Sequence, residues 1–156
     1  MKDPGSPTQA TFFETEAQLE VALAGVYASL VFNTSNSVPF TQILDHITDY
    51  SFLRGEVSAA KTATLGGLTP TSNLSNDYWN KFYTGIQRAN NLLSGMEKAR
   101  DVTSESRFEG IRAEALFLRA IFYSYLIELY GDVPFRAEIS TTLNDLALPR
   151  TPKAEI

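Results

Sequence analysis

A long apolar helix with a sharp end constrains this chain more than any other feature. The segment from 112 to 135 reads RAEALFLRAIFYSYLIELYGDVPF. Apolar residues leading into it and along it recur every three or four positions, as on the buried side of a helix: Phe108, Ile111, Ala115, Leu118, Phe122, Tyr125 and Leu129. Phe117, Ile121 and Leu126 widen this stripe beyond one side. We therefore expect the helix to pack against several neighbours.

Backbone chemistry predicts where this helix ends. Gly131 can adopt the positive φ with which many helices end, because glycine has no Cβ. Pro134 cannot continue a helix, and it biases Val133 toward extended backbone. Ser104 can cap the other end, although the position three residues later lacks the Glu or Gln of a full capping box. The sequence therefore predicts a helix over 105–130 with an extended segment after it.

Two more helices are predicted in the first third of the chain. Residues 14–31 have a clear apolar stripe, and the helix is expected to start near Glu14 or Thr15. Its apolar positions are Leu19, Ala22, Leu23, Val26, Tyr27 and Leu30. Residues 40–50 carry a shorter stripe of the same period, which predicts a second, shorter helix.

Residues 76–100 predict another long helix, which Asn76 or Asp77 can cap. Its apolar positions are Trp79, Phe82, Tyr83, Ile86, Ala89, Leu93 and Met96. Small and aromatic residues here and over 113–120 faintly repeat the spacing of a tetratricopeptide helix pair, although the two halves lie too far apart for a regular array. The predicted fold is therefore all-α and built from tetratricopeptide-like antiparallel helical hairpins.

The chain divides into a lead-in and one helical domain. Residues 1–13 are predicted to be a mobile lead-in, because their first part is rich in Pro, Gly, Ser and Thr. Residues 14–156 are predicted to form the domain. Within it, residues 52–72 form a long, glycine-containing loop that we expect to be exposed. Thr151 and Pro152 are typical of the start of a further helix, yet the sequence stops as that helix begins. We therefore expect this chain to be part of a longer protein.

The composition argues against several classes of function. A net charge of -5 at pH 7 and a pI of about 4.9 disfavour nucleic acid, whose phosphates require clustered Lys and Arg. No apolar run reaches the length of about eighteen residues that spans a membrane. The chain has no cysteine, so it has neither a disulfide framework nor a cysteine-based metal site.

No catalytic, cofactor or metal site is predicted. Asp45, His46 and Asp49 have a spacing that could hold a cation, but no fourth ligand is clustered nearby, so a solvated helix end is the simpler interpretation. Glu114 and Glu128 would lie about 20 Å apart along one helix, too far for two carboxylates to flank a glycosidic bond.

Charged residues of the helix over 105–130 are expected to hold the structure together. Glu109 with Arg112, and Glu114 with Arg119, should form ion pairs or bond to loop carbonyls.

Aromatic and polar residues at the borders of the 52–72 loop fit carbohydrate recognition. Sugars stack their apolar faces on aromatic rings and hydrogen-bond to amide, carboxylate and guanidinium groups. The candidate ligand-binding residues are Tyr50, Phe52, Arg54, Asn73, Asn76, Asp77 and Tyr78. Trp79 and Tyr83 lie on the helical stripe, so we expect them to pack in the core instead.

Ordered motifs along most of the chain resemble one known family. A Phe-Phe-x-Thr-Glu opening leads into Leu-x-Gly-x-Tyr over 12–27, and WNKFYTGIQRANNLL follows at 79–93. RAEALFLRA comes next at 112–120, then YGDVP at 130–134 and LPR at 148–150. Together these segments closely resemble the SusD/RagB family, which are glycan-binding lipoproteins of the outer membrane of Bacteroidetes.

That resemblance implies the N-terminal part of a helical scaffold that binds oligosaccharide and does not cleave it. It also implies a TonB-dependent, SusC-like transporter as partner in nutrient uptake. Relatives are held on the outer face of the outer membrane by a lipid on an N-terminal cysteine, which this sequence does not contain. Two alternatives are a helical-repeat scaffold that binds a peptide or protein, and a glycoside hydrolase, which would need two carboxylates across a cleft.

Overall fold

The computed structural model describes residues 12–31, 48, 73–139 and 147–156. Within them the chain forms α1 Glu16–Ala28, α4 Asn73–Gly95, the 3-10 helix η1 Met96–Val102, α5 Glu105–Tyr130 and the 3-10 helix η3 Lys153–Glu155. These residues contain no strand, and their one isolated β-bridge joins Val133 to Thr151 in antiparallel fashion. The predicted all-α fold is confirmed.

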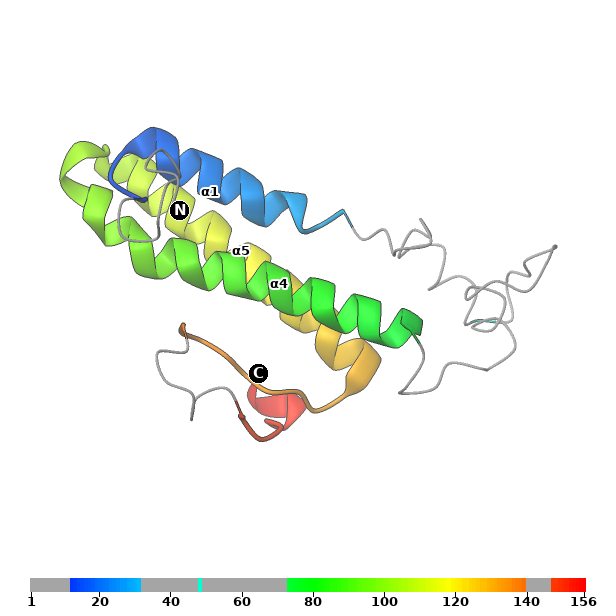
Figure 1. Ribbon diagram of the computed structural model, residues 1–156. Helices are drawn as coiled ribbons and strands as arrows, with labels where there is room; N and C mark the ends of the chain where they lie inside the picture. Colours follow the sequence, from blue (N-terminus) through cyan, green and yellow to red (C-terminus); the bar gives the residue numbers. More distant parts are fainter. Residues whose placement is uncertain (1–11, 32–47, 49–72, 140–146) are drawn as a thin grey trace, which may run out of the picture.

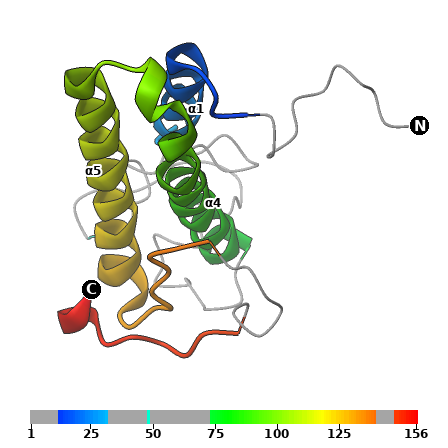
Figure 2. The same ribbon diagram turned by 90° about the vertical axis from the view of Figure 1, so that its left-hand side faces the viewer.

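α4 and α5 form an antiparallel helical hairpin connected by η1, and α1 packs along both helices (Figure 1). Figure 2 shows the same three helices from the side. Arg107 of α5 pairs with Glu20 of α1, with Nη2 2.6 Å from Oε2. Arg88 of α4 donates to the carbonyl of Gly25 in α1 at 3.0 Å. These bonds tie α1 to both members of the hairpin.

The helix ends follow the predicted local chemistry. The Thr15 hydroxyl accepts the backbone N–H of Gln18 at the start of α1. The Ser104 hydroxyl does the same for Arg107 at the start of α5. Gly131 ends α5 with a positive φ of 71°. The predicted Ser104 cap, the predicted start near Thr15 and the predicted stop of the long helix are confirmed, whereas the cap predicted at Asn76 or Asp77 is wrong because α4 begins at Asn73.

The core lies where the three helices meet. Its largest fully buried side chains are Phe82, Phe108, Phe122, Leu19, Ile86, Leu92, Met96, Ile111, Leu118, Leu126, Val26 and Val133. α4 and α5 pack closely at Gly85, where a Cβ would lie only 2.5 Å from Cζ of Phe122. Glycine at this position therefore makes room for the Phe122 ring.

The helix predicted over 76–100 has different bounds. It begins at Asn73 and ends at Gly95, and the remaining residues form η1. Gly95 is a poor helix former, and a Cβ there would lie 2.3 Å from the ring of Phe13. The further helix expected after Pro152 is present as the single turn η3.

The expectation that Phe117 helps to bury the long helix is wrong, because this side chain is 64% exposed. Phe108 and Leu118 of α5 belong to the core that α1 and α4 share, whereas Phe117 does not. The buried stripe of α5 is therefore narrower than the sequence predicted.

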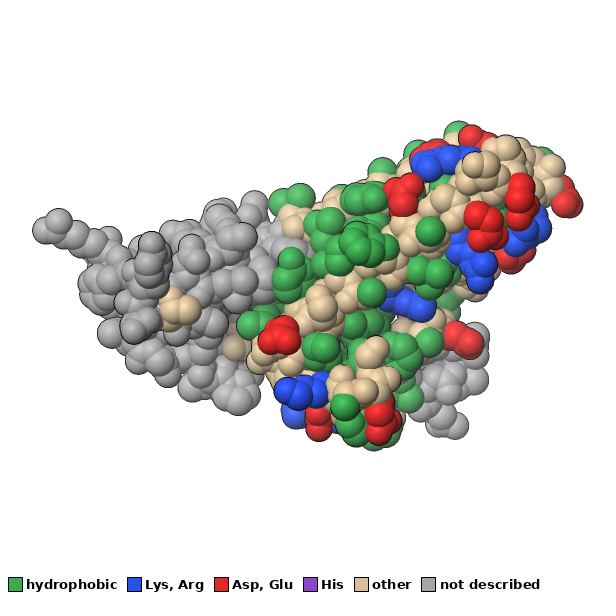
Figure 3. Space-filling view, turned by 180° about the vertical axis from the view of Figure 1, so that it is seen from behind, with side chains coloured by type: hydrophobic (Ala, Val, Ile, Leu, Met, Phe, Trp, Pro, Cys, Tyr) green, Lys and Arg blue, Asp and Glu red, His purple; other side chains and the backbone are tan. Residues whose placement is uncertain are grey.

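Viewed from behind, hydrophobic side chains gather along the middle of the described surface and charged ones toward its ends (Figure 3).

Several predictions fall outside the described residues. They are the helix over 40–50 apart from Thr48, the loop over 52–72, and the Asp45, His46 and Asp49 group. Among the residues that the structure does describe, no group of carboxylates and imidazoles could hold a metal ion. None of the described helices has the length and apolar character needed to cross a membrane.

Candidate functional site

After α5 the chain turns back and runs along α4 as an extended segment, residues 131–139, which we call the strap (Figure 1). Its single described backbone bridge is the one from Val133 to Thr151, in which the Thr151 N–H donates to the Val133 carbonyl at 2.9 Å. One bridge leaves most of its backbone groups in need of other partners. Side chains of the two long helices supply them.

Two side chains of α4 hold the strap from one side. The Tyr83 hydroxyl donates to the carbonyl of Pro134 at 2.7 Å. The Asn90 amide donates to the carbonyl of Arg136 at 3.0 Å and lies 3.5 Å from that of Glu138. Asn90 is only 4% exposed, so its amide is committed to this role.

Two side chains of α5 hold the same segment. The Tyr123 hydroxyl accepts the N–H of Arg136 at 2.6 Å and lies 3.2 Å from its carbonyl. Arg119 donates to the carbonyl of Ala137 and to the side-chain oxygen of Asn90, both at 2.7 Å. Four side chains, which we call the anchors (Tyr83, Asn90, Arg119 and Tyr123), therefore fix the path of the strap through its backbone atoms.

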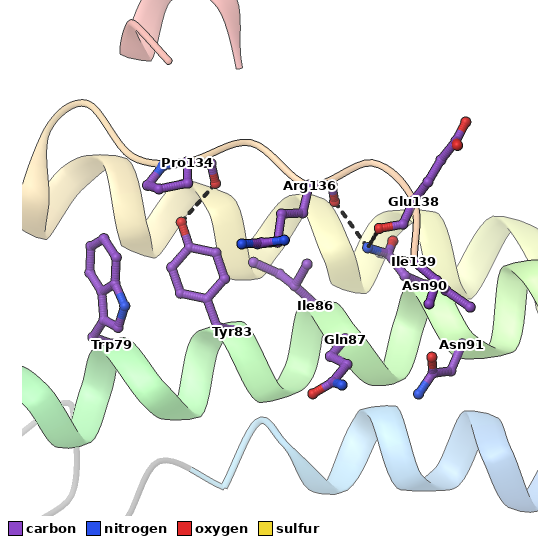
Figure 4. Close-up of a pocket in the computed structure, with 10 residues that line it drawn as sticks. All are labelled: Trp79, Tyr83, Ile86, Gln87, Asn90, Asn91, Pro134, Arg136, Glu138 and Ile139. Atoms are coloured by element: carbon purple, nitrogen blue, oxygen red, sulfur yellow. Dashed lines mark hydrogen bonds between the residues drawn. The ribbon is translucent and has the colours of Figure 1, made fainter. Parts of the chain in front are cut away.

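A groove of about 410 Å³ lies between α4 and the strap (Figure 4). Its lining residues are Trp79, Tyr83, Ile86, Gln87, Asn90, Asn91, Pro134, Arg136, Glu138 and Ile139. Its volume is in the range of small-molecule sites, about 300–1,000 Å³. The bonds from Tyr83 and Asn90 to the strap cross between the two walls, as the dashed lines of Figure 4 show.

One end of the groove is aromatic. The Trp79 ring lies 4.9 Å from that of Tyr83 and 5.1 Å from that of Tyr130, with the second contact edge to face. The Tyr130 hydroxyl donates to the carbonyl of Ser75 at 2.6 Å. These contacts hold the half-buried Trp79 in place while it lines the groove.

Burial shifts the titration of the tyrosines around the groove. It raises the pKa of Tyr130 to about 12, and it also raises the pKa values of Tyr83 and Tyr123, because the charged phenolate is poorly solvated there. All three are therefore neutral near pH 7 and act as hydrogen-bond donors.

We expect the fold to lose stability as the pH rises above about 10, the ordinary pKa of tyrosine. A raised folded-state pKa favours the neutral form, so the contribution of Tyr130 is complete below pH 10 and is lost as the pH rises toward its value of about 12. Urea unfolding midpoints between pH 8 and 12 would measure this loss. Tyr130→Phe should be less stable at pH 8 but decline less steeply, and an unchanged slope would contradict the assignment.

The structure describes only some of the seven candidate residues at the borders of the 52–72 loop. Tyr50, Phe52 and Arg54 lie outside the described residues, and Asn73 is the first residue of α4. Asn76 is exposed and Asp77 is half-buried in the first turns of that helix. Tyr78 is 3% exposed and stacks on Phe82 in the core, so its ring has little surface to offer a ligand.

Sequence reasoning assigned Trp79 and Tyr83 to the core, and both do pack against it, but they also line the groove. Gln87 and Asn91 were missed. They follow Tyr83 at four-residue intervals, which places their polar side chains on the same side of α4 as Tyr83. This spacing is the sequence pattern that could have predicted them as site residues.

The predicted ion pairs are confirmed in part. Arg112 pairs with Glu109 at 3.3 Å. The pairing of Glu114 with Arg119 is wrong: Glu114 pairs with Arg107 at 3.2 Å, whereas Arg119 bonds to a strap carbonyl, the other role expected for it. Arg119 lies on the side of α5 that faces the strap, and Glu114 on the side that faces α1.

Comparison with known proteins identifies the family. The SusD-like family, described as starch-binding and associating with the outer membrane, matches residues 2–152. Two SusD-like proteins of Formosa agariphila are 25% and 27% identical to this chain over 94% and 82% of its length. The chain spans only 29% and 26% of the lengths of those two relatives.

Solved structures agree with this fold. A SusD-like carbohydrate-binding protein from Bacteroides fragilis has a TM-score of 0.77 at 25% identity, covering 93% of this chain and 29% of that one. A surface glycan-binding protein from Bacteroides fluxus has a TM-score of 0.74 at 21% identity, over 90% of this chain and 30% of that one, which supports the fold alone. The tetratricopeptide-like helical architecture expected from the sequence is confirmed.

Proposed function

Because this chain belongs to the SusD-like family of starch-binding proteins that associate with the outer membrane, we propose that it is part of a glycan-binding protein of a nutrient uptake system. The family match over residues 2–152 is the observation that carries the proposal. We further propose that residues 14–156 are the N-terminal helical part of a longer protein, since the curated relatives extend well beyond the matched region.

In this proposal the protein binds its glycan and does not cleave it. A hydrolytic site needs two carboxylates on either side of one bond, within about 10 Å of each other. Glu114 and Glu128 both belong to α5 and lie about 20 Å apart by helix rise. The loop-border residues, Asn76 and Asp77 among them, remain proposed ligand contacts because amide and carboxylate groups suit sugar hydroxyls.

The partner in this proposal is a TonB-dependent, SusC-like transporter, and the location is the outer face of the outer membrane. A lipid anchor would be the attachment to the membrane. Association with the outer membrane in the family description supports this location.

We expect this chain to bind neutral oligosaccharides, and titration calorimetry against maltooligosaccharides and a panel of other plant, host and microbial glycans would measure it. Starch-derived sugars come first because the family is described as starch-binding. The same titrations with a helical peptide panel test the peptide-binding alternative. Binding of peptides with no heat from any glycan would contradict the proposal.

A further inference from the structure

We propose that the groove between α4 and the strap binds a short run of uncharged sugar residues, with Trp79 as the stacking surface and the Gln87 and Asn91 amides as hydrogen-bonding partners. This inference rests on the proposed glycan-binding function and assigns it a site. It does not depend on the loop-border residues whose side chains the structure describes, Asn76, Asp77 and Tyr78, because these three do not line the groove.

The aromatic end supplies the apolar contact. Pyranose rings have an apolar face, and a fixed indole offers the largest aromatic surface for it. Trp79 lies at one end of the groove, opposite Pro134 on the strap (Figure 4). Its packing against Tyr83 and Tyr130 holds the indole in one orientation, so little side-chain entropy remains to be lost when a ligand stacks.

The rest of the α4 wall supplies polar groups at regular spacing. Gln87 and Asn91 lie one turn apart along α4, about 6 Å by helix rise. Figure 4 draws no hydrogen bond from either amide to another lining residue, so within this set both keep a donor and an acceptor for a ligand. From Trp79 to Asn91 the helix rises about 18 Å, which is longer than a single sugar ring.

The charge of the lining favours an uncharged ligand. Among the described residues that line it, the side chains charged at neutral pH are Arg136 and Glu138, both from the strap, and their opposite charges cancel. An anionic glycan such as a uronate or sulfated polymer would need an excess of Arg and Lys, whereas the whole chain has a net charge of -5. The groove therefore fits a neutral oligosaccharide.

The groove is also formed before any ligand arrives. The Tyr83 and Asn90 bonds join its two walls, and Arg119 and Tyr123 fix the strap from behind. A site that needs no ordering retains more of its contact energy as affinity.

The test uses the fluorescence of Trp79, the single tryptophan of the chain, together with calorimetry on the same 156-residue protein. Titration with maltoheptaose should change the Trp79 emission with the midpoint that calorimetry gives. The double variant Gln87→Ala, Asn91→Ala should bind about tenfold more weakly, because two hydrogen bonds are lost. Asn80→Ala, an exposed amide on the same helix outside the groove, is the matched control and should bind within twofold of the parent.

The outcomes separate this inference from the proposed function. Calorimetric binding without a Trp79 signal, and with unchanged affinity of the double variant, would overturn the groove site and leave glycan binding intact. An equally strong response to a polyuronate would overturn the assignment to neutral sugars. Absence of heat from every glycan would instead count against the proposed function of this chain, and the site would fall with it.

Discussion

Replacing Gly85 with alanine is expected to lower the free energy of unfolding by about 2 kcal/mol, although alanine is the better helix former. The new Cβ would lie 2.5 to 2.8 Å from three ring atoms of Phe122, a side chain with no exposed surface. Neither the ring nor the two helices can move without disturbing the core around them. Urea unfolding of the parent and of Gly85→Ala measures the difference in free energy, provided that both have the same dependence of that free energy on urea concentration (the m-value).

Gly25→Ala is the matched control for this change. A Cβ on Gly25 meets nothing within 4 Å, so the same substitution in α1 should stabilise the protein by about 0.5–1 kcal/mol. Shortening the opposing ring in Gly85→Ala, Phe122→Leu should recover part of the loss if the clash is its cause. Equal effects of the two glycine substitutions would show that helix propensity, and not close packing, governs both positions.

Asn90→Leu is expected to destabilise the protein by about 3 kcal/mol, the second large effect. The substitution removes the donor to the Arg136 carbonyl and the acceptor of Arg119, and both groups are left in a half-buried setting without those partners. Asn80→Leu, at an exposed amide of the same helix, should change stability by less than about 0.5 kcal/mol.

Hydrogen exchange distinguishes loss of the strap from a general loss of stability. The Arg136 N–H donates to Tyr123, so this amide should exchange faster in Asn90→Leu while amides in the middle of α5 change only in line with global stability. Unchanged protection at Arg136 would contradict the view that Asn90 holds the strap.

Local chemistry made the three long helices of the described residues, and the two ends of α5, predictable from the sequence. The 3.6-residue stripe, the Ser104 cap and the Gly131 stop all depend on residues within a few positions of each other. The same reasoning failed for Phe117, because periodicity tells that a side of a helix is apolar but does not tell whether another element covers it. The predicted end of the helix near Arg100 also failed: α4 ends at Gly95, and the local pattern does not reveal that this glycine packs against the distant Phe13.

The groove could not be predicted from the sequence for a related reason. Trp79 and Tyr83 have the spacing of core residues, and they do pack against the core, so no local signal separates a buried aromatic ring from one that also borders a groove. The second wall comes from residues about fifty positions later, and its place depends on bonds from Asn90 and Arg119 to backbone carbonyls. Every residue has a backbone carbonyl, so the sequence does not indicate which carbonyls accept these bonds.

The hydrogen bonds from the anchors to the strap go to main-chain atoms, so they do not depend on which side chains the strap carries at the groove. Ala137 and Glu138 have exposed side chains, and the bonds that hold them in place involve their carbonyls. Glu138 lines the groove, so a substitution there can change the chemistry of the wall while leaving every anchor in place. If the groove is the sugar site proposed above, substitutions in this one short segment could change which sugar is bound. They would not cause the loss of stability that substitutions in the core cause.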